Sequence, residues 1–540
     1  MAHRTISPVE RVLVANRGEI ALRVFRTCER LGIGTVAVVA PDDRGSLHAR
    51  SAGATIEIAS YLDPAEHVRA AQASGADAVH PGYGFLAESP LLAEAVEAAA
   101  LTWIGPPAEA LRLGGDKLAA KRIAQEEGVP IVPEGTADEL GYPLLVKAAA
   151  GGGGRGMRVV RAPAELDEAV AAAQREAEAA FGDGTVFLER YLERPRHVEI
   201  QLLAVRVGER ECSVQRRHQK VLEESPSPGL DPATRARMSE AAAAFARAIG
   251  YRGAGTAEFV LAADGEVFFL ELNGRIQVEH PVTEAVTGLD LVEQQLRIAG
   301  GESLVALRLE PPSGHAVEVR LYAEDPRTFL PQAGRLERLR LPTGVRVDAG
   351  VEEGDEVGTA YDPMIAKLIA HAPTRGEALD RLAVALAETE VGGVTTNLPF
   401  LRWLVGHPLV RAGETTTAFL VEHPPLSPPP LRLAAPAWGG GWRLNLPAAP
   451  PATPPDVDEA AQHEHAEGSG STLVAPMPGT VLEVAVAPGD HVRARQRLVV
   501  LEAMKMENPI AAPFDATVTS VHVVAGDRVA GGAVLVELEA

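Results

Sequence analysis

Cysteine and long apolar runs are both scarce in this sequence. Its 540 residues include only two cysteines, Cys28 and Cys212. Two thiols cannot make a disulfide framework, and no spacing typical of a zinc site is present. This usage indicates a reducing, cytoplasmic setting. No uninterrupted apolar stretch approaches the roughly 20 residues of a membrane-spanning helix, and no secretion signal precedes the first strand-like run, so we expect no membrane association.

Positive charge is also in short supply. Lysine and arginine number 51 against 73 aspartates and glutamates, a formal net charge of −22. Such an acidic chain is poorly suited to holding a phosphodiester backbone, so no nucleic-acid partner is expected. Any anionic substrate must be bound by local basic clusters. The 46% share of hydrophobic residues is enough for several globular domains.

One lysine lies between two similar halves near the end of the chain. Residues 475–502 match residues 512–539, and Lys505 lies between them with a methionine on each side. This repeat predicts a small two-fold β-sandwich with Lys505 at the tip of a hairpin. An exposed lysine without a role is the alternative interpretation.

The first hundred residues alternate apolar strands with helices. Residues 11–40 predict a strand, a helix and a second strand, and residues 76–80 predict a third strand. This alternation favours a parallel sheet that is covered on both faces. The turns at 16–19 and 81–84 follow strands, at the sheet edge where such folds bind ligands.

A run of four glycines, Gly151–Gly154, is enclosed by strand-like segments at 144–147 and 157–160. It is not a P-loop, because no Gly-Lys-Ser/Thr follows. Glycines lose maximal backbone entropy on ordering, so the run is a poor strand or helix interior. We expect a hairpin flap whose amides close over phosphate oxygens.

Two carboxylates and an amide fall on neighbouring strand-like segments. Glu258 is on the first segment, and Glu271 and Asn273 are on the second. Residues two apart on a strand share a face, so Glu271 and Asn273 point the same way. Such oxygen ligands suit Mg²⁺. A solvated row of carboxylates is the alternative.

From about residue 9 to 420, the chain resembles the biotin carboxylases of the ATP-grasp superfamily. The matching motifs are residues 15–21, 80–86, the glycine run, 215–220 and 275–281. The Met-Lys-Met at Lys505 resembles the biotin carboxyl carrier domain. The resemblance implies an α/β N-terminal domain (9–115), α+β ATP-grasp (116–312) and C-terminal carboxylase (313–422) domains, a Pro/Ala/Gly-rich linker (423–471), and an all-β flattened biotinyl/lipoyl-type sandwich (472–540).

The resemblance also implies roles for individual residues. ATP would be bound by Lys117, Lys147, Gly153, Gly154, Glu189, Arg190, Tyr191, Leu192, His197, Gln215, His218 and Glu258. Mg²⁺ or Mn²⁺ would be held by Glu258, Glu271 and Asn273, and bicarbonate by Lys220, Arg275, Gln277 and the amide of Val278. Glu279 would be the general base, Arg338 would stabilise the biotin enolate, and Lys505 would carry biotin. Gly274 stands where a bulkier residue is common, and we expect it to add backbone freedom.

The leading hypothesis is therefore the biotin-containing subunit of an acyl-CoA carboxylase of the acetyl, propionyl or methylcrotonyl type. It would use ATP and bicarbonate to supply carboxybiotin to a separate carboxyltransferase (beta) subunit. A biotin protein ligase would attach the biotin, and the chain would form a homo-oligomer within a larger hetero-oligomer. Two alternatives stay open, namely a subunit of a two-chain pyruvate carboxylase and a carrier or assembly scaffold with an inactive ATP site.

Overall fold

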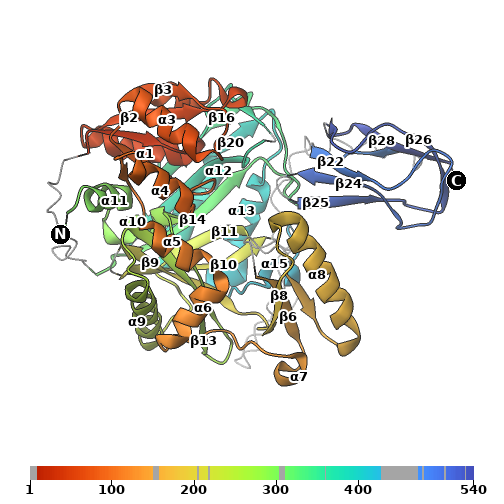
Figure 1. The fold of residues 1–540 in the computed structure, drawn as a ribbon, viewed down its shortest axis with the longest axis horizontal. Coiled ribbons are helices and arrows are strands. Elements are labelled where there is room, and N and C mark those ends of the chain that lie inside the picture. The colour runs from red at the N-terminus through yellow and green to blue at the C-terminus, as the bar shows by residue number, and fades with distance from the viewer. Residues whose placement is uncertain are drawn as a thin grey trace, which may run out of the picture.

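The computed structural model in Figure 1 describes residues 9–149, 157–203, 206–216, 219–302, 311–358, 360–426, 472–476, 479–503, 506–529 and 531–539. Most of the predicted linker, at 427–471, lies outside these ranges. None of the helices in the described ranges combines the length and apolar character needed to cross a bilayer.

The first unit is a five-stranded sheet with the order β3-β2-β1-β4-β5. Its central strand, β1, runs parallel to both of its neighbours. Val12 and Val14 of β1 face one buried apolar cluster, and Leu13 faces another. This confirms the predicted parallel sheet with two covered faces. The elements of this unit are β1 (Arg11–Val14), α1 (Gly18–Arg30), β2 (Gly34–Val39), α2 (Leu47–Ser51), β3 (Ala54–Glu57), α3 (Pro64–Ser74), β4 (Ala78–His80), α4 (Pro90–Ala98) and β5 (Thr102–Trp103).

A small three-stranded sheet, β7-β6-β8, follows in the chain. The two strands predicted on either side of the glycine run pair antiparallel, with Val146 opposite Arg158. The glycines themselves lie outside the described residues. The elements are α5 (Ala108–Gly115), α6 (Lys117–Glu126), α7 (Ala137–Leu140), β6 (Leu144–Ala148), β7 (Arg158–Val160), α8 (Leu166–Phe181) and β8 (Val186–Arg190).

The largest sheet in the described residues has eight strands, in the order β13-β12-β9-β10-β11-β14-β19-β17. It continues across the boundary expected at residue 312, because Leu222 of β11 pairs with Val319 of β14. Its elements are β9 (Arg196–Leu203), β10 (Arg206–Arg216), β11 (Gln219–Ser225), α9 (Pro232–Ala248), β12 (Ala254–Leu261), β13 (Val267–Asn273), α10 (His280–Thr287), α11 (Leu291–Ala299), β14 (His315–Tyr322), β17 (Arg346–Ala349) and β19 (Met364–Ala372).

One face of β14 contributes to a large apolar core. Val317, Val319 and Leu321 belong to the large apolar core that includes residues of α12 and α13. Helix α10 packs against β14 (Figure 1). The remaining elements of this part are α12 (Arg375–Glu388), α13 (Leu398–Gly406), α14 (Pro408–Ala412), α15 (Phe419–Glu422) and the two-stranded pairs β15 (Gly334–Arg335) with β18 (Glu356–Val357) and β16 (Arg338–Arg340) with β20 (Glu390–Gly392).

The C-terminal unit is a sandwich of two four-stranded sheets, β21-β28-β26-β23 and β25-β24-β22-β27. Leu498 and Leu501 of one half share a core with Leu535 and Leu538 of the other, as the repeat predicts. Ala503 pairs with Met506, and Met504 and Lys505 between them lie outside the described residues. The strands are β21 (Thr472–Val474), β22 (Gly479–Val484), β23 (His491–Val492), β24 (Arg497–Ala503), β25 (Met506–Ala511), β26 (Ala516–Val521), β27 (Arg528–Val529) and β28 (Val534–Glu539).

Candidate active site

Lys220 is the hub of a buried charged cluster. Its Nζ lies 2.5 Å from Glu279 Oε1, 2.5 Å from Glu199 Oε2 and 2.9 Å from Glu258 Oε1. Only 12% of its side chain is exposed. Burial alone would lower the pKa of Lys220, but the three carboxylates raise it well above its usual value. The site therefore holds a fixed positive charge that faces acids from β9, from β12 and from the segment just before α10.

Glu258 accepts hydrogen bonds at one oxygen and has a histidine close to the other. Asn273 and Gln277 donate to Oε1 over 2.9 and 2.8 Å, and His197 Nε2 lies 3.0 Å from Oε2. Burial would raise the pKa of Glu258, but Lys220 and His197 hold it well below its ordinary value. This carboxylate is ionised at neutral pH.

Glu271 lies opposite Glu258 in the register of β12 and β13. Burial first, and then the charge of Glu258, raises the pKa of Glu271. A divalent cation between the two carboxylates would relieve this repulsion, and the amide of Asn273 bonds Glu258 directly. The predicted Mg²⁺ ligands are therefore brought together, and their oxygen donors fit the ion.

Arg275 follows β13, and its guanidinium donates to three oxygen acceptors, of which the Ile276 carbonyl is the most distant at 3.4 Å. Its Nε donates to Glu88 Oε2 over 3.1 Å, and its Nη2 donates to Asn273 Oδ1 over 2.9 Å. The side chain is 19% exposed, so an anion can reach the guanidinium from solvent. Asn273 thus connects Arg275 to Glu258.

The next residues of this loop have anchors of their own. Gln277 Oε1 accepts from Arg210 over 3.0 Å, while its Nε2 donates to Glu258. The carbonyl of Val278 accepts from Lys367 Nζ over 2.9 Å. Three of the four residues predicted to bind bicarbonate therefore lie on this loop. The fourth, Lys220, contacts the loop at Glu279.

Glu279 stands just before α10 and is held between two cations. Lys220 donates to its Oε1 over 2.5 Å, and Arg320 donates to its Oε2 over 2.9 Å. Burial would raise the pKa of Glu279, but Lys220, Arg320 and Arg210 hold it far below its usual range. An ionised carboxylate of this kind has the protonation state that a general base requires.

Three lysines converge at the predicted nucleotide site. Lys117 is the first residue of α6, and Lys121 lies one turn later on the same helix. Lys147 Nζ lies 3.2 Å from Glu189, which also accepts a hydrogen bond from Lys121. Burial lowers the pKa of Lys117, and the charges of Lys147 and Lys121 add to this shift, although the charge of Glu271 opposes it. These ammonium groups form a local basic cluster in an acidic protein, as an anionic substrate requires.

The other predicted nucleotide residues lie on and after β8 or on β10. Arg190 pairs with Glu266 at 3.1 Å and is 37% exposed. The amide of Tyr191 donates to Pro143 O over 3.3 Å, which joins this segment to the start of β6. Leu192 packs against a small apolar cluster, and Gln215 donates to Cys212 O. Gly153, Gly154, His218 and Lys505 lie outside the described residues.

Comparison with known proteins identifies the family. Family models match the chain in sequence order: "Biotin carboxylase, N-terminal domain" at 8–111, "Carbamoyl-phosphate synthase L chain, ATP binding domain" at 116–307, "Biotin carboxylase C-terminal domain" at 318–422, and "Biotin-requiring enzyme" at 471–538. A biotin carboxylase of Halalkalibacterium halodurans is 46% identical over 441 residues, which cover 77% of this chain and 98% of that protein.

The chain belongs to the biotin carboxylase family. It is an ATP-dependent carboxylase with a fused biotin carrier domain, and its cofactors are biotin and Mg²⁺. The alpha3 subunit of a biotin-dependent acyl-coenzyme A carboxylase of Mycobacterium leprae is 43% identical and covers 94% of this chain and 95% of its own length. The chain spans 61% of the methylcrotonoyl-CoA carboxylase alpha subunit of Arabidopsis thaliana.

Solved structures of relatives share the fold of this biotin carboxylase. The biotin carboxylase domain of Hydrogenobacter thermophilus 2-oxoglutarate carboxylase, described as a dimer in complex with MgADP, ADP and bicarbonate, is 42% identical, with a TM-score of 0.74 over 77% of this chain and 98% of that one. Pyruvate carboxylase of Rhizobium etli matches with a TM-score of 0.73 and 42% identity over 77% of this chain and 40% of that one.

Arg338 is not brought to the active site of this biotin carboxylase. It lies on β16, where its side chain is 61% exposed and its Nε donates to Glu390 over 2.7 Å. The two-stranded pairing of β16 with β20 directs it to that surface carboxylate. The arginine beside Glu279 is instead Arg320 on β14.

The pattern of β14 could have revealed Arg320. Its strand alternates the apolar Val317, Val319 and Leu321 with the charged Glu318 and Arg320. Every residue of the strand is buried. Charged residues are almost never buried without a partner. A strand with this composition therefore carries charges into a site or an ion-pair network.

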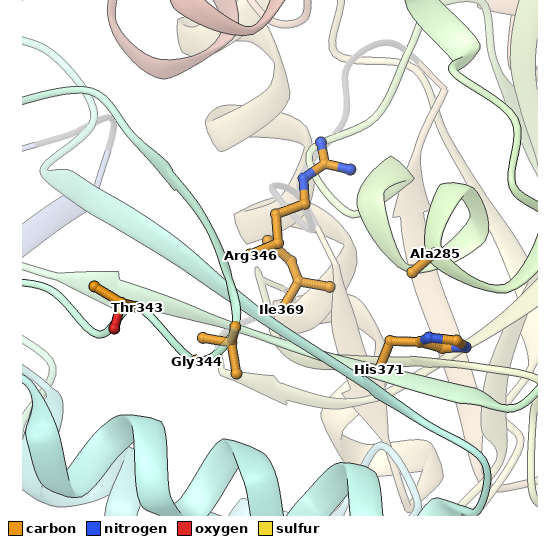
Figure 2. Close-up of a pocket in the computed structure, with 7 residues that line it drawn as sticks. Ala285, Thr343, Gly344, Arg346, Ile369 and His371 are labelled. Atoms are coloured by element: carbon orange, nitrogen blue, oxygen red, sulfur yellow. The ribbon is translucent and has the colours of Figure 1, made fainter.

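Figure 2 shows a cavity of about 240 Å³. None of the predicted site residues lines it. Its lining consists of Ala285, Thr343, Gly344, Val345, Arg346, Ile369 and His371.

Proposed function

We propose that this chain carboxylates biotin attached to Lys505 and delivers the carboxyl group to a separate carboxyltransferase subunit of an acyl-CoA carboxylase. The observation that carries this proposal is the ionised Glu279, held between Lys220 and Arg320 beside the loop of Arg275. The Mycobacterium leprae relative, which matches this chain over 95% of its own length, is named an acyl-coenzyme A carboxylase alpha subunit. The acceptor is proposed to be an acetyl-, propionyl- or methylcrotonyl-type CoA thioester.

In the first half-reaction, an oxygen of bicarbonate attacks the γ-phosphorus of ATP and ADP leaves. Arg275, Lys220, Gln277 and the Val278 amide hold the bicarbonate, and Glu279 removes its proton. The lysine cluster of Lys117 and Lys147 offsets the repulsion between the two anions, which is a positioning and electrostatic contribution. Glu258, Glu271 and Asn273 would hold Mg²⁺, which neutralises phosphate charge when bound.

In the second half-reaction, the mixed anhydride of carbonate and phosphate breaks to CO₂ and phosphate. Biotin on Lys505 would supply the ureido nitrogen that takes up CO₂, and the released phosphate would accept the proton of that nitrogen. We assign to Arg320 the role first expected of Arg338, namely a cation for the negative charge that develops on the ureido oxygen. Its position 2.9 Å from Glu279 supports this assignment.

A subunit of a two-chain pyruvate carboxylase is the second candidate, because a pyruvate carboxylase is among the similar structures. We also infer that a biotin protein ligase modifies Lys505 and that the chain forms a homo-oligomer within a hetero-oligomer. The dimer named for the 2-oxoglutarate carboxylase domain supports the first of these assemblies.

The test is to purify this chain with its carboxyltransferase partner and to supply MgATP, bicarbonate and a panel of acetyl-, propionyl- and methylcrotonyl-CoA and pyruvate. Carboxylation of a CoA thioester that is lost in Lys505→Arg supports the proposal. Carboxylation of pyruvate alone would favour the second candidate.

A further inference from the structure

The loop that carries Arg275 to Glu279 is anchored from behind by a fully buried lysine. Lys367 lies on β19 and donates from Nζ to the carbonyl of Val278 over 2.9 Å. Its side chain is 0% exposed. No substrate can reach this ammonium from solvent, so any part that it takes in the reaction must act through the loop.

The same ammonium has a carboxylate partner from the other end of the chain. Nζ lies 3.1 Å from Oε1 of Glu19, which is in the first turn of α1. The second oxygen of Glu19 accepts a hydrogen bond from the hydroxyl of Tyr83 over 2.6 Å. Tyr83 lies in the turn after β4. Lys367 therefore connects the loop, through Glu19, to helix α1 and to the turn after β4.

Three consecutive residues of the loop are fixed by four different cations. Arg210 holds the side chain of Gln277, Lys367 holds the carbonyl of Val278, and Lys220 and Arg320 hold Glu279. The Val278 carbonyl belongs to the peptide plane that leads into Glu279. A donor on that carbonyl therefore sets the direction in which the Glu279 backbone leaves the loop, as well as the backbone conformation of Val278.

A structural role alone accounts poorly for this lysine. Removing an ammonium from water is costly, and a buried ion pair is often no more stabilising than apolar groups of the same size. Asp348 and Glu318 face Lys367 from β17 and β14. Three buried acids thus surround the ammonium group that donates to the Val278 carbonyl.

We propose that Lys367 is a positioning residue for bicarbonate, which acts by orienting the Val278–Glu279 peptide. This inference rests on the proposed binding of bicarbonate at Arg275, Gln277 and Val278. Its consequence is selective: loss of Lys367 weakens the use of bicarbonate and leaves the nucleotide site, which is built on other elements, intact.

The experiment uses full-length Lys367→Met and the double variant Lys367→Met/Glu19→Gln. The double variant removes Lys367 together with Glu19, so Glu19 is not left as a buried carboxylate without its ion-pair partner. ATP hydrolysis is measured with free biotin while bicarbonate or ATP is varied, and thermal unfolding is followed in parallel. We expect the KM for bicarbonate to rise at least about tenfold and the KM for ATP to change less than about twofold.

Glu19→Gln alone is the matched control, because it keeps the Lys367–Val278 bond. It should raise the KM for bicarbonate by less than about threefold. Lys367→Arg keeps a charged donor and should restore most of the bicarbonate affinity. A folded double variant with the wild-type KM for bicarbonate, or with equal rises in both KM values, would overturn the proposal. Absence of bicarbonate-dependent hydrolysis in the wild type would instead refute the proposed function.

Discussion

Arg320 Nη2 lies 2.9 Å from Glu279 Oε2, and the same nitrogen lies 2.5 Å from Glu223 Oε1. All three side chains are buried, so the guanidinium is fixed by two carboxylates with little access to water. A cation held in this way needs no reorganisation when charge develops beside it.

Replacing Arg320 should therefore abolish most turnover. Arg320→Met is expected to lower biotin-dependent phosphate release by roughly a hundredfold or more, the cost of removing one fixed donor to a developing charge. Arg338→Met is the matched control, because Arg338 is exposed and pairs only with a surface carboxylate among the described contacts. Its activity should stay within about twofold of wild type. An active Arg320→Met or an inactive Arg338→Met would reverse the assignment.

Close packing against Leu111 favours glycine at position 274. A Cβ at this position would lie 2.6 Å from Leu111 Cδ2. The backbone amide of Gly274 donates to Glu88 Oε1 over 2.9 Å. The gain of backbone freedom expected at this position stays a prediction. Gly274→Ala should destabilise the protein by about 1–3 kcal/mol, the usual range for overpacking.

Denaturant unfolding of Gly274→Ala, Leu111→Ala and the double variant tests this contact. Since truncating Leu111 makes room for the new methyl group, the double variant should lose less stability than the two single losses combined. Strict additivity would show that the two positions do not meet.

Glu223 should make stability depend on pH. Burial raises the pKa of Glu223 to about 7, although the charge of Arg320 opposes this shift. The folded state then binds a proton that the unfolded state has released, so stability falls as pH rises from about 4.5 to about 7. Relative to Glu223→Gln, the wild type should lose on the order of 3 kcal/mol across this window, at about 1.4 kcal/mol for each pKa unit.

Denaturant unfolding of both proteins at pH 5 and pH 8 measures this difference. Glu318 lies opposite Glu223 in the register, and its pKa is also raised by burial, so both acids shift stability in the same direction. The same stability difference at both pH values would show that Glu223 titrates normally.

Local patterns were enough to predict much of the site. The alternation of residues on β13 placed Glu271 and Asn273 on one face, and the structure sets Glu271 opposite Glu258. The internal repeat predicted the carrier sandwich in the same way. Both features depend on residues that are close in sequence or on one strand pair.

Contacts set by distant strand pairing could not be predicted. Arg320 faces Lys367 only because β14 pairs with β19 in one particular register. The continuation of the sheet from β11 to β14 likewise joins segments that the sequence assigns to different domains. The placement of Arg338 at the site failed for this reason, since nothing near it in sequence shows that its strand pairs with β20.

The most direct test of the account follows the carboxyl group itself. Biotinylated full-length chain, without any partner, is incubated with MgATP and ¹⁴C-bicarbonate, and protein-bound label is counted. We expect acid-labile label approaching one per biotin, and none in Lys505→Arg or Glu279→Gln. Label that persists in Lys505→Arg, or its absence from the wild type, would contradict the account.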